Sequence, residues 1–177
     1  MVPDLCYARN VSDHCAVPVN SESGPEDEAL LAAYGATLWL VAHPEQGDLP
    51  LRLEQRFQGV DLLPAAILTA YNPRSELRSE HENAAANQQL AAALAATGTP
   101  CLPTIAHGTG AETKKWDEPG FCASGIPLPV AIDLAARFDQ NALVWVGVDA
   151  VPVLIATRDG FLKGRTGQRL FVPINQR

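Results

Sequence analysis

The chain has 177 residues, of which 47% are hydrophobic and 19% are charged, so its composition is that of a folded domain rather than a disordered chain. Its formal net charge is −7, with −11 on residues 1–157 and +4 on residues 158–177, which carry five basic side chains and one acidic side chain. An acidic body repels nucleic-acid phosphates, and no uncharged apolar run reaches the roughly twenty residues of a membrane-spanning helix, so neither nucleic acid nor a membrane is an expected partner.

The two ends of the chain differ from its middle. Residues 1–25 lack hydrophobic periodicity and are rich in Pro, Ser and Asn, which predicts a flexible leader. We expect a single α+β domain over residues 26–157 and a basic C-terminal tail over 158–177, which either docks on the acidic body or contacts an anion. The first residues lack the basic start and apolar run of a secretory signal, which predicts a cytoplasmic protein.

Three helices are predicted from capping signals and periodicity. The first is short and begins at Pro25, with proline and acidic residues in its first turn. The second covers roughly residues 80–97 and begins with Ser79 and Glu82 at the spacing of a capping box. The third covers residues 127–139, where apolar residues recur on one side.

Strands are predicted where short apolar or alternating runs lie between turn residues. A long polar loop is predicted over residues 107–119, because glycine and charged residues are frequent there. The predicted strands cover residues 36–42, 49–55, 64–71, 101–106, 120–124, 142–148 and 151–157.

From residue 65 onward the predicted elements follow the order βαββαβ, which is the split βαβ pattern of ferredoxin-like domains. We therefore predict an α+β fold in which an antiparallel or mixed sheet carries helices on one face. A hairpin is expected before this core and a further strand after it.

Polar side chains gather where the strand at 64–71 passes into the second helix. The turn between them contains Tyr71, Asn72, Arg74 and Ser75. Such side chains beside a helix N-terminus are suited to an anion, because the unpaired N–H groups there carry partial positive charge. The turn is therefore a candidate ligand-binding site.

Two asparagines of the second helix lie on its apolar stripe. Asn83 and Asn87 share the helical spacing of Leu90 and Leu94, so we expect both amides to be buried. A buried amide without partners costs about 1 to 3 kcal/mol, so each must bond to backbone, water or a ligand. Two interpretations stay open: the amides tie down the preceding turn, or they line a ligand pocket.

The remaining candidates lie farther along the chain. Trp116 and Glu118 precede a predicted strand and are placed to edge a pocket, and Gln140 follows the third helix. The glycines and lysines before them do not match the G-x-x-x-x-G-K-[ST] spacing of a phosphate-binding loop. No metal site is predicted, because the four cysteines lack C-x-x-C spacing. Cofactor and catalytic residues are left open.

Several of these residues together resemble a known family. They are Leu30-Leu31-Ala32-Ala33-Tyr34 before a strand, Thr69-Ala70-Tyr71-Asn72-Pro73-Arg74-Ser75, Glu82-Asn83 with Asn87 and Leu90, Trp116 with Glu118, and Phe138-Asp139-Gln140-Asn141-Ala142. In this order the chain is similar, over roughly residues 28–150, to the uncharacterised bacterial family of domain of unknown function 3293. The resemblance implies a small standalone bacterial protein, and it implies no activity or cofactor.

The leading hypothesis is a protein that binds a small polar or anionic metabolite, with enzymatic activity left open. The alternative is a protein-interaction or regulatory module, in which the asparagines are structural and an exposed sheet edge or hydrophobic patch meets a protein partner. The expected ligand site consists of Tyr71, Asn72, Arg74, Ser75, Asn83, Asn87, Trp116, Glu118 and Gln140.

Overall fold

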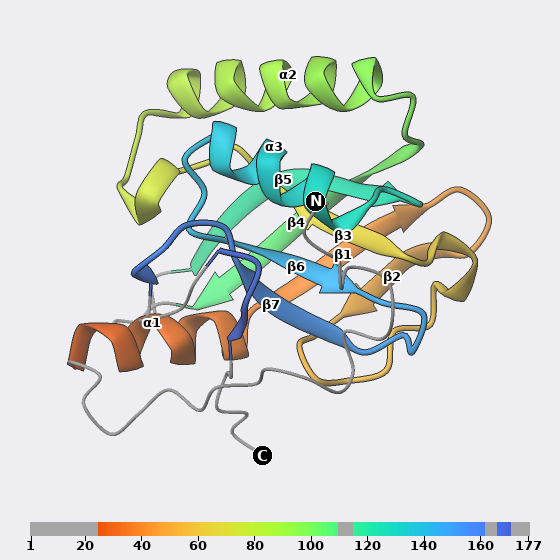
Figure 1. Cartoon of the computed structure of the whole chain (residues 1–177), viewed down its shortest axis with the longest axis horizontal. Helices are drawn as coiled ribbons and strands as arrows, with labels where there is room; N and C mark the ends of the chain where they lie inside the picture. The colour runs from red at the N-terminus through yellow and green to blue at the C-terminus, as the bar shows by residue number, and fades with distance from the viewer. Residues whose placement is uncertain (1–24, 110–114, 162–165, 171–177) are drawn as a thin grey trace, which may run out of the picture.

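Eight strands and three α-helices make up the part of the chain that the structure, a computed structural model, describes: residues 25–109, 115–161 and 166–170. The elements are α1 (Pro25–Ala36), β1 (Leu38–His43), β2 (Gly47–Leu51), β3 (Ala65–Leu68), α2 (Glu80–Ala96), β4 (Cys101–Thr109), β5 (Lys115–Ser124), α3 (Leu128–Arg137), β6 (Ala142–Val146), β7 (Pro152–Ala156) and β8 (Arg169–Leu170) (Figure 1). The predicted leader, apart from its last residue, and much of the predicted tail lie outside the described residues.

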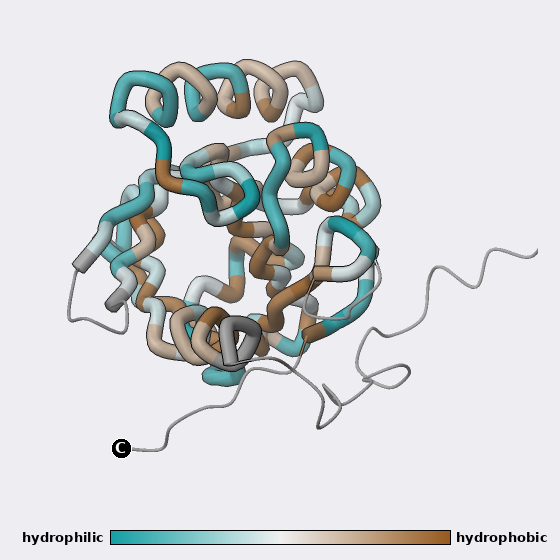
Figure 2. The backbone as a smooth tube through the Cα atoms, turned by 90° about the vertical axis from the view of Figure 1, so that its left-hand side faces the viewer, coloured by the Kyte–Doolittle hydropathy of each residue, from teal (hydrophilic) through white to brown (hydrophobic). Residues whose placement is uncertain are grey.

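All eight strands belong to one antiparallel sheet, in the order β2-β1-β4-β5-β3-β6-β7-β8. The sheet curls into a half-barrel, and Figure 2 shows the backbone of the curl with α2 lying outside it. The inner face, which carries Ile67 and Val144, packs against α1. The outer face, which carries Ala66 and Trp145, packs against α2 and α3. Because successive side chains of a strand point to opposite faces, each strand contributes to both cores.

The predicted ferredoxin-like split βαβ core is wrong, and so is the placement of helices on one face alone. The elements from residue 65 onward do follow the predicted chain order, but they belong to a larger, curled sheet with helices on both faces. β1 extends this sheet beside β4, and β7 extends it beside β6. Element order depends on local sequence, whereas the partner of each strand depends on which sheet edges remain open in the collapsed chain.

The predicted polar loop at 107–119 is wrong over most of its length. β4 continues to Thr109 and β5 begins at Lys115, and the two strands pair from end to end. Polar residues in this hairpin have partners across the strands: His107 Nδ1 lies 2.6 Å from Asp117 Oδ1. Strand pairing satisfies the backbone hydrogen bonds here. The polar composition therefore reflected polar side chains that interact across the two strands, and not a loop.

α2 is the longest described helix, and the predicted capping box at its start is confirmed. The Glu82 N–H donates to Ser79 Oγ at 3.3 Å, and the Ser79 N–H donates to Glu82 Oε2 at 3.0 Å. Leu90 and Leu94 are buried against the outer face. Of the described helices, α2 included, none combines the length and the apolar character needed to cross a bilayer.

Candidate functional site

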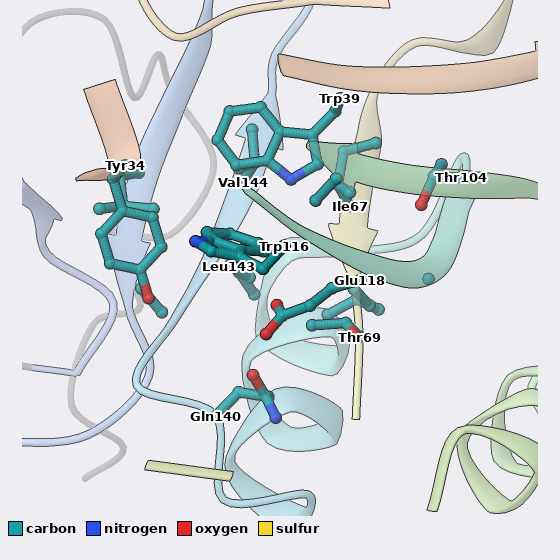
Figure 3. Close-up of a pocket in the computed structure, with 15 residues that line it drawn as sticks. Tyr34, Trp39, Ile67, Thr69, Thr104, Trp116, Glu118, Gln140, Leu143 and Val144 are labelled. Atoms are coloured by element: carbon teal, nitrogen blue, oxygen red, sulfur yellow. The ribbon is translucent and has the colours of Figure 1, made fainter. Parts of the chain in front are cut away.

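A pocket opens on the inner face of the sheet beside the end of α1 (Figure 3). The space inside the pocket, together with the open solvent at its mouth, has a volume of about 540 Å³. Alternate residues of β4 and β5 face it, as the pleat of the sheet requires, and consecutive residues at the end of β3 and the start of β6 complete its wall. The lining residues are Tyr34, Trp39, Ile67, Leu68, Thr69, Thr104, Ala106, Trp116, Glu118, Gly120, Gln140, Ala142, Leu143, Val144 and Leu154.

Two glycines, Gly108 and Gly120, allow close packing in this wall. Gly108 lies opposite Trp116 in the β4–β5 pair, and a Cβ atom on Gly108 would lie 2.0 Å from the indole. A Cβ atom on Gly120 would lie 2.5 Å from the carbonyl oxygen of Leu68. Glycine at 108 therefore lets the indole lie directly over the β4 backbone, and glycine at 120 lets β5 lie close to β3.

Glu118 brings a carboxylate to a position where this face of β5 is otherwise apolar. Burial raises the pKa of Glu118 above its ordinary value, and a hydrogen bond from Asn72 opposes that rise. Asn72 Nδ2 donates to Glu118 Oε1 at 2.7 Å, while Oε2 accepts no hydrogen bond within the described part of the chain. Figure 3 shows the carboxylate pointing into the pocket. One carboxylate oxygen is thus held by the protein and the other is open to a ligand.

Tyr34 places a hydroxyl on the α1 side of the pocket. Burial raises the pKa of Tyr34, the negative charge of Glu118 adds to the rise, and a hydrogen bond with Ser75 opposes it. The Tyr34 ring meets the Phe161 ring edge to face, with the centroids 6.4 Å apart. Tyr34 therefore stays protonated at neutral pH, and its hydroxyl lies within the influence of the Glu118 charge.

The two asparagines of α2 are buried, as predicted, and hold the turn before the helix. Asn83 Oδ1 accepts from the Asn72 N–H at 2.8 Å, and Asn83 Nδ2 donates to Asn72 Oδ1 at 3.1 Å. Asn87 Oδ1 accepts from the Ala70 N–H at 3.2 Å, and Asn87 Nδ2 donates to the Pro119 carbonyl oxygen at 3.3 Å. We call Asn72, Asn83 and Asn87 the turn clasp. Its helical amides find donor and acceptor partners inside the protein.

The turn held by the clasp has unusual backbone angles. The φ angles of Asn72, Arg74 and Ser75 are 46°, 58° and 62°. Residues with side chains rarely adopt this left-handed region, at a cost on the order of 1 kcal/mol each. The clasp offsets this cost, and Gln140 Nε2 adds a hydrogen bond to the Tyr71 carbonyl oxygen at 3.0 Å. The resulting conformation directs the Asn72 side chain to the pocket carboxylate.

Arg74 and Tyr71, both predicted site residues, lie beside the pocket rather than in its wall. Arg74 is exposed, and its Nη2 lies 2.9 Å from Asp139 Oδ1. The buried Tyr71 donates its hydroxyl to Glu80 Oε1 at 2.9 Å. The guanidinium that was expected to bind an anion is therefore already paired with a carboxylate at the surface.

The structure brings some of the predicted residues together and leaves others apart. Trp116, Glu118 and Gln140 line the pocket. Asn72 reaches the pocket through its bond to Glu118, and Ser75 reaches it through Tyr34. The other predicted residues belong to the turn clasp or flank the turn.

Sequence reasoning missed Tyr34, Trp39, Thr69 and Thr104 as pocket residues. The alternation of side chains along β3 and β4 would have placed Thr69 and Thr104 on the inner face, had the strands been paired correctly. Tyr34 had no such signal, because the packing of α1 against the inner face joins segments far apart in the sequence.

The pocket offers open acceptor oxygens together with the donor indole N–H groups of Trp39 and Trp116. Gln140 Nε2 is engaged with the carbonyl oxygens of Tyr71 and Phe138, at 3.0 and 3.4 Å, which leaves the amide oxygen of Gln140 as the unused group. The Thr69 hydroxyl donates to the Pro119 carbonyl oxygen at 2.8 Å. Among the described residues, no cluster of three His, Cys, Asp or Glu side chains is placed to hold a metal ion.

Comparison with known proteins places the turn clasp and Glu118 in one family segment. Residues 68–143 match the family model described as "Protein of unknown function (DUF3293)". The matched segment runs from the end of β3 to the start of β6 and leaves α1 outside it. No curated protein and no solved structure matches the chain. The match confirms the resemblance to domain of unknown function 3293 over residues 68–143, a shorter span than the residues 28–150 expected from the sequence.

Proposed function

We propose that this protein binds a small molecule in the pocket around Glu118, which we call the Glu118 pocket. The observation that carries the proposal is a carboxylate on the inner face whose pKa is raised by burial and whose Oε2 has no partner among the described residues. Burying a carboxylate without compensation destabilises a fold, so such groups gather at sites where a ligand or substrate uses them. A concave, largely apolar wall with a few convergent polar groups is typical of small-molecule sites.

The pocket favours a neutral or cationic ligand over the anionic metabolite expected from the sequence. Glu118 and Tyr34 are the titratable side chains in its wall, and neither carries positive charge. The start of α2 is also poorly suited to an anion, because Ser79 caps it and Glu80 and Glu82 occupy its first turn. An anion would have to displace the Glu82 carboxylate from the Ser79 N–H group, from which the carboxylate already accepts a hydrogen bond.

The alternative of a protein-interaction module has less support from the sheet edges. β2, at one edge, contains Pro50, which cannot donate a backbone hydrogen bond to an added strand. β8, at the other edge, has two residues. Within residues 25–109, 115–161 and 166–170, neither edge offers a long ladder to a partner strand.

A pocket-filling variant tests the proposal. Small molecules that raise the melting temperature are first selected by thermal shift and confirmed by calorimetry. Ala142 lines the pocket on β6, so Ala142→Phe should abolish their binding by occupying the space. Ala42 is an exposed strand alanine outside the pocket, and Ala42→Phe is the matched control that should retain binding.

Circular dichroism establishes that both variants are folded. Ligands that bind Ala142→Phe and Ala42→Phe with the affinity of the unmodified protein would contradict the proposal. So would the absence of any stabilising ligand in a broad set that spans cations, neutral compounds and anions.

A further inference from the structure

We propose that the ligand of the Glu118 pocket is a small primary amine with an apolar body, bound as its ammonium ion. This inference rests on the proposed function and specifies the chemistry of the same site. It follows from three properties of the pocket: an open carboxylate oxygen on Glu118, an unused amide oxygen on Gln140 and a wall with aromatic rings.

Two open acceptor oxygens favour a ligand that donates hydrogen bonds. Oε2 of Glu118 and the amide oxygen of Gln140 have no donor partner within the described residues, while the Gln140 Nε2 group is engaged with backbone carbonyls. An ammonium group has three N–H donors and no acceptor. It matches these two oxygens, and its bond to the carboxylate is charge-assisted.

The aromatic side chains select a cation with an apolar body. Tyr34, Trp39 and Trp116 all line the pocket, and Figure 3 shows them together with Glu118 around one space. Aromatic faces attract cations through the negative potential above the ring, and Trp is the strongest of the three types. The same rings provide apolar surface for the carbon skeleton of the amine.

The charge balance around Glu118 also lacks a cation. The titratable groups that act on this site are Tyr34 from α1, Tyr71 from the turn and, through its bond to Tyr71, Glu80 from α2. Burial is the main cause that raises the pKa of both tyrosines, which keeps them neutral. Arg74 is paired at the surface with Asp139. A bound ammonium ion would supply the positive charge that none of these described side chains supplies.

Three probes of similar size but different charge test the inference: 2-phenylethylamine, 2-phenylethanol and 3-phenylpropanoate. We expect the amine, and other primary amines of graded size, to bind in calorimetry and to raise the melting temperature of the full chain. The alcohol should bind at least about 10-fold more weakly, because it lacks the charge-assisted bond. The carboxylate should not bind, because its charge repels Glu118.

The isosteric variant Glu118→Gln tests the role of the carboxylate. It keeps the shape of the side chain and an acceptor for Asn72, and it removes a buried charge, so it should remain folded. The affinity for the amine should fall about 10- to 100-fold, while the affinity for the alcohol changes little. Asp117→Asn is the matched control, because Asp117 is exposed and lies outside the pocket lining.

Proton linkage gives a second signature. Burial raises the pKa of Glu118 above its ordinary value of 4.5 in the empty pocket, and an ammonium ion favours the ionised carboxylate. Binding should therefore release protons, and affinity should rise as the pH increases from 4.5 through the pKa of the empty site. Calorimetry in two buffers of different ionisation enthalpy measures this release, and Glu118→Gln should abolish it.

The outcomes separate this inference from the proposed function. Neutral or anionic ligands whose binding is abolished by Ala142→Phe, together with amines that do not bind, would overturn the amine inference and keep the pocket. Amines that bind Glu118→Gln as tightly as the unmodified protein would also overturn it. Amine binding that survives in Ala142→Phe would overturn both.

Discussion

The turn clasp and the Glu118 pocket are adjacent polar regions that differ in whether their polar groups have hydrogen-bond partners inside the protein. In the clasp, the amides of Asn83 and Asn87 find donors and acceptors inside the protein. In the pocket, Glu118 has one oxygen bonded to Asn72 and one without a described partner. Asn72 belongs to both regions, since its side chain forms one hydrogen bond with Asn83 and another with Glu118.

The difference separates groups that stabilise the fold from groups that remain available to a ligand. A buried polar group with complete internal partners contributes to stability, and its removal leaves the partner unsatisfied. A partly buried carboxylate with incomplete partners, such as that of Glu118, lowers stability, and its removal relieves that cost. Substitutions in the two regions should therefore change stability in opposite directions.

The largest effect is expected in the clasp. Asn87→Ala leaves the buried Ala70 N–H without its acceptor, so the free energy of unfolding should fall by about 2 to 3 kcal/mol. Urea denaturation measures the loss. Gln88→Ala on the exposed side of the same helix is the control and should change stability by less than about 0.5 kcal/mol. Equal effects of the two substitutions would remove the distinction between clasp and surface.

A steric substitution in the pocket wall should have the next largest effect. Gly108→Ala forces the new Cβ atom against Trp116 and should lower stability by about 2 kcal/mol, with a change in tryptophan fluorescence. Adding Trp116→Ala should remove the clash, so the two substitutions should be strongly non-additive. Additive losses would mean that the indole does not lie over Gly108.

Glu118→Gln should stabilise the protein without ligand by about 1 kcal/mol at neutral pH. The sign depends on pH: because the folded-state pKa of Glu118 is raised, its stabilising contribution is present below about pH 4.5 and is lost as pH rises through the folded-state pKa. The advantage of the variant should therefore grow from pH 4.5 toward neutrality. Thermal denaturation across this pH range measures the stability difference between the variant and the unmodified protein. If the variant is less stable at neutral pH, Glu118 stabilises the fold as the clasp residues do, and the contrast fails.

The smallest effect is expected at Arg74. Its ion pair with Asp139 is exposed, so Arg74→Ala should lower stability by less than about 0.5 kcal/mol. It should also leave amine binding unchanged, since Arg74 is absent from the pocket lining. Calorimetry with 2-phenylethylamine measures this, and a 10-fold change in affinity would extend the site to the surface turn.

Local sequence determined the features whose causes are local. The helix with Ser79 as its cap and the burial of Asn83 and Asn87 were predicted, because capping and helical spacing depend on residues within a few positions of one another. Of the nine residues predicted as one ligand site, Trp116, Glu118 and Gln140 line the pocket.

Tertiary structure alone decided the rest. The eight-stranded curled sheet depends on which strand edges pair. The paired residues of β1 and β4 are more than sixty positions apart in the sequence. The same closure brings Tyr34 of α1 to Glu118 of β5 and places Gly108 beneath Trp116. Neighbouring residues in the sequence therefore predicted where polar side chains gather, while only the collapsed chain decided which of them are satisfied and which remain open, because partners come from distant segments.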